Sequence, residues 1–185
     1  MIPIILDTET TGFVPPAKVV QIAAVAICPD GDDSMFEALC NPGIEHLHTD
    51  SAIGALEFNG ISAGKIAMAH TDDEVAYEFK EWLRYLTAKY NQEYIIYAYN
   101  YRFDQRFLAE KPWSIEEDDW AEDDLMEWAR QLMCNSERGY ARPNKPPKLV
   151  EAEYSLEMDI PGNPHDAMHD ALAAAVVYKM FTSII

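Results

Sequence analysis

The sequence is poor in several residue types, and each shortage argues against a class of protein. Only three cysteines occur among 185 residues, Cys28, Cys40 and Cys134, and none belongs to a Cys-x-x-Cys pair. This spacing argues against a zinc site and favours reduced thiols in a cytoplasmic protein. The longest apolar run, 171–177, is far shorter than the ~20 residues that a membrane-spanning helix needs. Asp7 interrupts the apolar N-terminal residues and no basic region precedes them, so a signal peptide is not expected.

Basic residues are scarce as well. The 14 Lys and Arg are outnumbered by 32 Asp and Glu, which gives a net charge of −18. Such a balance disfavours binding to phosphate-rich partners, because like charges repel. The charges are unevenly distributed, however. Acidic residues crowd 116–124, whereas a proline-rich loop carries Arg138, Arg142, Lys145 and Lys148. Both clusters would ordinarily be solvated surface, and the basic one is the candidate for a binding role.

The remaining composition is that of one α/β domain over residues 1–185, since a 49% hydrophobic chain of this length can bury an ample core. Tight turns between the first three apolar stretches predict an antiparallel meander, and the later alternation of helix and strand predicts a mixed sheet with helices on its faces. Strands are expected at 2–6, 18–28, 34–39 and 94–99, and helices at 51–59, 71–90, 102–111, 123–133, 154–158 and 166–181.

A pair of carboxylates follows the first strand. Asp7 and Glu9 stand two residues apart, so both side chains project from one face of an extended chain. Held side by side they repel each other unless a cation lies between them, and a divalent metal bound by oxygens is the natural candidate. An isolated Asp-x-Glu is more often a solvated strand end, so the metal hypothesis needs further ligands.

Two later acids can supply them. Asp104 lies in the first turn of the helix after the fourth strand, near Asp7 if the two strands are parallel neighbours; alone it would be an ordinary helix-start acid. Asp170 shares a helical face with alanines that let the last helix approach the sheet. A short carboxylate buried there would be costly unless it is paired or bound to a metal.

His165 is the candidate base. It precedes Asp170 by five residues and can reach the same site only from the loop before the helix, as Pro164 and a capping Asp166 indicate. The alternative is a surface histidine.

These residues form three motifs: Asp7-Thr8-Glu9-Thr10-Thr11-Gly12, Asn100-x-x-Phe103-Asp104 and His165-x-Ala167-x-x-Asp170-Ala171. The set resembles the DEDDh 3′–5′ exonucleases, which include bacterial proofreading subunits, ribonuclease T and oligoribonuclease. The likeness covers nearly the whole chain. It implies a single exonuclease domain with a ribonuclease-H-like fold, a five-stranded mixed sheet flanked by helices. Tyr99 and Gln21 stand where many relatives have His and Glu, which leaves the chemistry intact.

The resemblance also implies a mechanism. Phosphodiester bonds would be hydrolysed at the 3′ end with two Mg²⁺ or Mn²⁺ ions about 3.5–4 Å apart, releasing nucleoside 5′-monophosphates. Asp7 would bridge both ions, Glu9 and Asp170 would hold the ion that binds the attacking water, and Asp104 would support the other. His165 would take the water's proton as general base.

Substrate contacts are expected around the motifs. Thr11 and Gly12 could offer backbone N–H groups to the terminal nucleotide, and Phe13 or Phe103 could pack against its base or sugar, although core packing explains Phe103 equally well. The basic loop would guide the phosphates. The full set of candidate substrate-binding residues is Thr8, Thr10, Thr11, Gly12, Phe13, Asn100, Phe103, Arg138, Arg142 and Lys145.

Three hypotheses follow. The leading one is an exonuclease on the 3′ end of single-stranded or frayed DNA, with a separate polymerase as a candidate partner. The nearest alternative keeps the chemistry and acts on short RNA or RNA 3′ tails. The third is a non-catalytic interaction module whose acidic surface docks on a basic partner. The sequence leaves the oligomeric state open.

Overall fold

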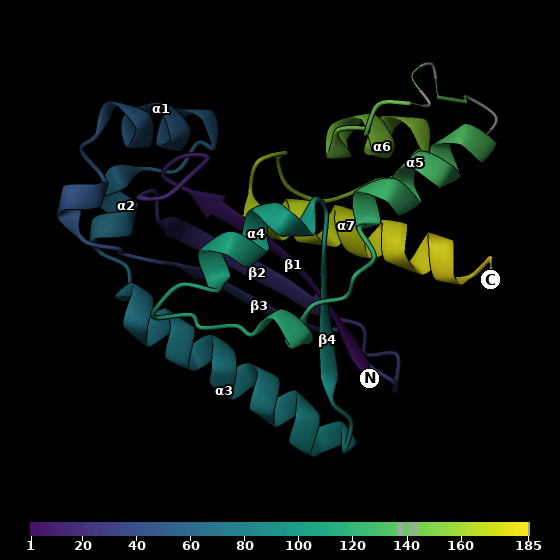
Figure 1. Ribbon diagram of the computed structural model, residues 1–185, viewed down its shortest axis with the longest axis horizontal. Coiled ribbons are helices and arrows are strands. Elements are labelled where there is room, and N and C mark those ends of the chain that lie inside the picture. The colour runs from purple at the N-terminus through teal and green to yellow at the C-terminus, as the bar shows by residue number, and fades with distance from the viewer. Residues whose placement is uncertain (137–138, 141, 143, 185) are drawn as a thin grey trace.

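A computed structural model describes residues 1–136, 139–140, 142 and 144–184. Its centre is one mixed sheet (Figure 1) in which β2 pairs antiparallel with β1 and with β3, and β4 pairs parallel with β1. The strand order is β3-β2-β1-β4. This confirms the predicted meander. The parallel pairing of the first and fourth strands meets the condition under which Asp104 was expected near Asp7. The strands are β1 (Ile2–Thr10), β2 (Val19–Ala26), β3 (Ser34–Leu39) and β4 (Tyr94–Ala98).

The prediction of five strands is wrong, because the described residues form four. Where a fifth strand would lie beside β4, Trp120 makes only an isolated parallel bridge with Ile96, and the Ala121 N–H donates to the Ile96 carbonyl at 2.8 Å. The 3₁₀ helix η2 (Glu117–Asp119) precedes this bridge and an acidic turn follows it. Asp and Glu are unfavourable in strands, so the pairing stops after one residue.

The helices lie around this sheet (Figure 1). Thr71 and Glu74 form the predicted capping box at the start of α3: the Thr71 N–H donates to Glu74 Oε2 at 2.9 Å, and the Glu74 N–H donates to Thr71 Oγ1 at 3.3 Å. The helices are α1 (Asp50–Phe58), α2 (Ala63–Ala67), α3 (Asp72–Tyr90), α4 (Tyr101–Leu108), α5 (Leu125–Asn135), α6 (Leu149–Ser155) and α7 (Ala167–Thr182), with a further 3₁₀ turn, η1 (Ile44–His46).

The helix predicted at 154–158 is wrong in position. Its place is taken by α6, which begins at Leu149, where the Lys148 N–H donates to Glu151 Oε2 at 3.0 Å. Helix α6 ends at Ser155, before Glu157, whose φ of 55° lies in the left-handed region. The predicted loop before it, 135–148, is therefore followed by a helix earlier than the sequence pattern indicated.

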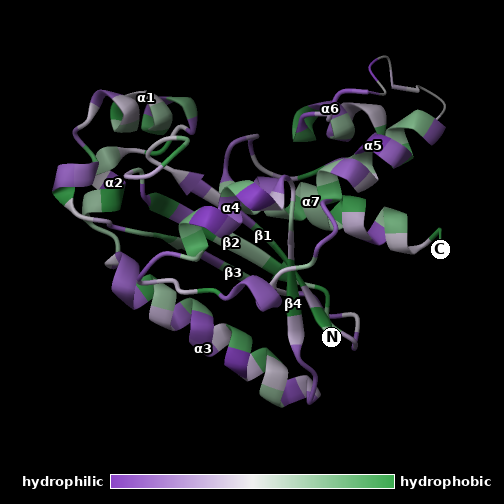
Figure 2. Cartoon of the chain, viewed as in Figure 1, coloured by the Kyte–Doolittle hydropathy of each residue, from purple (hydrophilic) through white to green (hydrophobic). Residues whose placement is uncertain are grey.

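Alternation along β1 separates two cores. Ile4 and Leu6 pack on the side of α3, whereas Ile5 packs on the side of α5 and α7. Hydrophobic colours concentrate on the central strands, and α3 alternates between hydrophobic and polar residues (Figure 2). Asp7 and Glu9 have the same parity as Ile5, so they project from the face that α7 covers. The strand therefore directs both carboxylates toward the last helix.

No helix in the described part of the chain combines the length and the apolar character needed to cross a lipid bilayer.

Candidate active site

The acids of the three motifs meet at the end of β1. Asp104 reaches it from the first turn of α4, and Asp170 from the first turn of α7. Asp104 is only 2% exposed. Its Oδ1 accepts two hydrogen bonds from Thr8, one from the backbone N–H at 3.0 Å and one from Oγ1 at 2.7 Å. These bonds fix the α4 carboxylate against β1, as the parallel β1–β4 pairing allows.

The four carboxylates lie close enough to change one another's ionisation. Burial, followed by repulsion from Asp104, Asp170 and Glu9, raises the pKa of Asp7 well above its usual value. Burial and repulsion from Asp170 and Asp104 raise the pKa of Glu9 to about 8. Burial raises the pKa of Asp104 to about 7 against the opposing Thr8 hydrogen bonds, and burial raises the pKa of Asp170 to about 6. The raised pKa values indicate that the negative charges of the four carboxylates are not neutralised by nearby positive groups.

The donor set fits a hard divalent cation. One ligand atom each from Glu9, His165 and Asp170 lies within 4.8 Å of the others. Among the described residues, no Lys or Arg forms an ion pair with any of the four acids. Carboxylate oxygens without a protein counter-ion suit Mg²⁺ or Mn²⁺.

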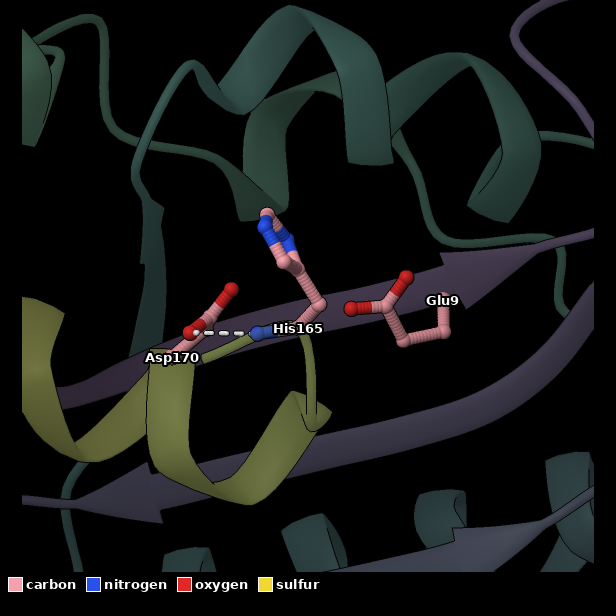
Figure 3. A group of neighbouring side chains, drawn as sticks. All are labelled: Glu9, His165 and Asp170. Carbon is pink, nitrogen blue, oxygen red and sulfur yellow. Dashed lines mark hydrogen bonds between the residues drawn. The ribbon is translucent and has the colours of Figure 1, made fainter. Parts of the chain in front are cut away.

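His165 lies in the loop before α7, and Asp166 caps that helix as predicted by accepting from the N–H groups of Met168 and His169. His165 has a φ of 66°, and its N–H donates to Asp170 Oδ1 at 3.4 Å. Figure 3 shows this bond, with Glu9 and Asp170 on either side of His165. The imidazole packs against Phe58 with ring centroids 4.3 Å apart. The ring is exposed, so a bound substrate could reach it.

A cavity of about 710 Å³ opens beside these groups and is lined by Glu9, His165 and Asp170. Of the residues predicted to bind substrate, Thr10, Gly12, Phe13 and Phe103 also line it. Phe13 is 83% exposed, as a residue that packs against a ligand can be. At Gly12 a Cβ would lie 2.6 Å from Ser51 Oγ, so glycine lets this turn approach α1 closely.

Other predicted substrate residues lie elsewhere. Thr8 is bonded to Asp104, and the Asn100 N–H donates to Asp124 Oδ1 at 2.8 Å. The Thr11 N–H, expected to face the terminal nucleotide, instead donates to the Lys18 carbonyl at 2.8 Å. None of these three lines the cavity. A role of these three residues in substrate binding stays a prediction.

The basic loop is only partly consistent with its predicted role. Arg142 forms an ion pair with Glu151 and lines a separate pocket with Tyr140 and Tyr154. Lys145 is exposed and does not line the main cavity. Arg138 lies outside the described residues.

Sequence reasoning missed the two walls of the cavity. Phe58 and Asn59 lie at the end of α1, and the Asn59 side chain opposes the rise of the Glu9 pKa. Across the cavity, Lys148 and Val150 lie at the start of α6. Lys148 belonged to the basic cluster, but nothing in the local sequence marks which of the cluster's cations faces the acids.

The two departures from the family pattern also contact the site's framework. Gln21 pairs with Glu9 across β1 and β2. Its Oε1 accepts from the Ala167 N–H at 3.3 Å, and its Nε2 donates to Asp166 Oδ2 at 3.4 Å. The Tyr99 hydroxyl donates to the Pro147 carbonyl at 2.9 Å. Gln21 thereby joins the strand of Glu9 to the start of α7.

Solved structures of known proteins share this fold. Cell-death related nuclease 4 (CRN-4) is 21% identical with a TM-score of 0.75, over 99% of this chain and 64% of its own. The nuclease domain of 3′hExo, described as a DEDDh family member bound to rAMP, is 17% identical with a TM-score of 0.72, over 99% and 92%. E. coli Exonuclease I in complex with a dT13 oligonucleotide is 20% identical with a TM-score of 0.71, over 98% and 41%.

The chain therefore spans less than two thirds of the length of CRN-4 and of Exonuclease I. No match was found among curated protein sequences. The model of the exonuclease family matches residues 4–178. Because that match covers nearly the whole chain, this protein belongs to the exonuclease family, and it has the ribonuclease-H-like fold of the DEDDh nuclease domain of 3′hExo.

Proposed function

We propose that this protein is a metal-dependent 3′–5′ exonuclease that removes nucleoside 5′-monophosphates from single-stranded or frayed DNA, and that residues 1–185 act as one exonuclease domain. The observation that carries the proposal is the cluster of mutually repelling acids, Asp7, Glu9, Asp104 and Asp170, two of which, Glu9 and Asp170, line one cavity with His165. A structural role alone would not favour four unneutralised carboxylates in a partly buried position.

The catalytic roles follow from the donor set. Two divalent ions, when bound, supply Lewis-acid polarisation of the phosphate and a water molecule that is easily deprotonated. Asp7, which Asp104, Asp170 and Glu9 repel, would be a central ligand of these ions. Glu9 and Asp170, on either side of His165, would hold them together with Asp104. An imidazole nitrogen of His165 accepts the proton of the attacking water.

The cavity walls support a single-stranded 3′ end as the ligand. Phe13, Phe58 and Phe103 offer apolar faces to a base or sugar, and Lys148 offers a positive charge to a phosphate. A volume of about 710 Å³ falls within the roughly 300–1,000 Å³ typical of small-ligand pockets. Terminal nucleotides are therefore a suitable occupant.

RNA is the second candidate substrate. The similar structures include a 3′-exonuclease domain bound to rAMP and one described as recognising a histone mRNA stem-loop. Exonuclease I, in contrast, was solved with dT13 and dA16 oligonucleotides. The choice depends on contacts to the 2′-OH.

The test uses matched DNA and RNA oligomers of one sequence, labelled at the 5′ end, with Mg²⁺ or Mn²⁺ and with a chelator. We expect a ladder that shortens from the 3′ end, metal dependence, faster loss of DNA and no products from the Asp7→Ala variant. Faster loss of RNA would select the RNA alternative. Products that persist in Asp7→Ala, or inactive wild-type protein on all substrates, would contradict the proposal and favour an acidic interaction module.

We also propose a cytoplasmic location for this protein. Cys28, Cys40 and Cys134 are all free thiols, which suits a reducing cytoplasm. A polymerase whose frayed 3′ ends this domain would proofread is the candidate protein partner.

A further inference from the structure

Beside the acids lies a pair that the sequence motifs do not assign, the partly buried Glu153 of α6 and the buried His169 of α7. Their side chains are 14% and 4% exposed, and His169 Nε2 lies 3.2 Å from Glu153 Oε2. The other ring nitrogen, His169 Nδ1, lies 3.2 Å from the carbonyl oxygen of Pro161. One ligand atom each from Glu153, His169 and Asp170 lies within 4.8 Å of the others. The pair therefore adjoins the acid that the proposed mechanism uses.

Both ring nitrogens of His169 are engaged. A carbonyl oxygen can only accept, so Nδ1 donates to Pro161. The contact between Nε2 and the Glu153 carboxyl group needs one further proton, whichever of the two partners carries it. Removing either side chain would leave a buried polar group unpaired, which costs much more than the net value of the intact pair.

Three parts of the active site meet at this imidazole. Glu153 lines the cavity itself, together with Lys148 and Val150 at the start of the same helix. Pro161 belongs to the loop 156–166, which carries His165. The same loop packs on the ring, since a Cβ added at Gly162 would lie 3.5 Å from His169 Nδ1. His169 itself directly precedes Asp170.

We propose that the Glu153–His169 pair is a positioning element of the active site: it fixes the loop of His165 and the first turn of α7 with respect to the α6 wall. Neither residue needs to contact substrate for this role. Loss of the pair would let His165 and Asp170 move relative to Glu9 while the sheet and its core stay folded. This inference rests on the proposed exonuclease function for its catalytic readout and on metal binding for an independent one.

The first test compares Glu153→Ala and His169→Ala with the conservative variant Glu153→Gln. The amide of the introduced side chain can donate to Nε2 of a neutral His169, which keeps the geometry without a charge. Residues that support metal ligands typically contribute about 10–100-fold to activity or metal affinity. We expect kcat to fall about 10-fold or more in both alanine variants, KM to stay within about 3-fold, and Glu153→Gln to stay within about 3-fold of wild type.

The second test measures Mn²⁺ affinity by electron paramagnetic resonance on the same proteins, without substrate. We expect about 10-fold weaker binding in Glu153→Ala and His169→Ala, and near wild-type binding in Glu153→Gln. The double alanine variant should resemble each single one, because the two residues act as a unit. His70→Ala and Glu78→Ala are the matched controls, since His70 and Glu78 form an exposed pair at 3.0 Å remote from the cavity.

Folding is checked by circular dichroism and thermal melting. If an alanine variant does not fold, Glu153→Leu/His169→Leu fills the space without a buried charge; we expect it to fold with kcat and Mn²⁺ affinity reduced as above. Folded variants with lower Tm but wild-type kcat and Mn²⁺ affinity would overturn the inference and leave a purely stabilising pair. If wild-type protein hydrolyses no oligomer yet Glu153→Ala still loses Mn²⁺ affinity, the proposed function fails and the positioning role stands.

Discussion

Thr8 donates two hydrogen bonds to one oxygen of Asp104, across 96 residues of sequence, at 3.0 Å from its N–H and 2.7 Å from its Oγ1. Both residues are buried. The bonds favour the ionised form of Asp104 and so oppose the rise that burial causes in its pKa. A threonine within the first motif, predicted to bind substrate, thus stabilises the ionised form of a candidate metal ligand.

Replacing Thr8 with Val removes the hydroxyl and keeps the backbone donor. The pKa of Asp104 should rise above its present value of about 7, and Mn²⁺ binding near pH 7 should weaken by about 1.5 kcal/mol, roughly tenfold. Isothermal titration calorimetry measures this affinity. Thr10→Val is the control on the same strand, because Thr10 Oγ1 donates to the Gly12 carbonyl and not to an acid. Equal affinities in wild type and Thr8→Val would refute the role of the hydroxyl.

The raised carboxyl pKa values predict how metal-free stability depends on pH. Unfolded Asp and Glu titrate near pH 4, whereas the folded-state pKa values of Asp170, Asp104 and Glu9 are about 6, 7 and 8. Between these limits the folded protein binds more protons than the unfolded chain, so the free energy of unfolding falls as pH rises from about 4 to 8.

Asp7→Asn should flatten this dependence and stabilise the metal-free protein near pH 8, because it removes the acid that all the others repel. Urea unfolding with a chelator at several pH values measures the free energy of unfolding of both proteins. Saturating Mg²⁺ should restore the stability of the wild-type protein at high pH. A wild-type protein whose stability rises steadily with pH over this range would contradict the electrostatic account.

His165→Asn separates proton transfer from metal binding. Asparagine tolerates the left-handed backbone at φ 66° and keeps the N–H that donates to Asp170, but its amide cannot act as a base. We expect kcat to fall about 10²–10⁴-fold, with Mn²⁺ affinity reduced no more than about 3-fold. Single-turnover hydrolysis of a labelled oligomer measures the rate. The base assignment does not survive if His165→Asn turns over at the wild-type rate, and His70→Asn serves as the exposed control.

Lys148 should contribute more to substrate binding than Lys145. Lys148 lines the cavity, whereas Lys145 is exposed away from it. Lys148→Ala should raise KM for a single-stranded oligomer about 3–10-fold at low salt and make KM less sensitive to salt, since one phosphate contact is lost. Lys145→Ala should change neither. If both variants raise KM equally, the whole basic loop guides the strand, as its composition suggested.

Local interactions explain what could be predicted from the sequence. Asp7 and Glu9 share a face because a strand repeats every two residues, and Thr71 and Asp166 start helices through bonds to residues two or three positions away. The order of the strands in the meander follows from short turns. The motifs placed the four acids and His165 on the right elements, since each motif spans one junction between a loop and a helix or strand.

Only the tertiary structure decided which residues surround those acids. The single bridge at Trp120 in place of a fifth strand, the shift of α6 to Leu149, and the pairing of Arg142 with Glu151 depend on packing between segments far apart in sequence. The same is true of Phe58 beside His165 and of Glu153 beside His169. Periodicity and capping act over a few residues, whereas the walls of a cavity are set by how whole helices dock on the sheet. Local sequence was therefore enough to identify the candidate catalytic residues, whereas long-range packing determined which residues surround them.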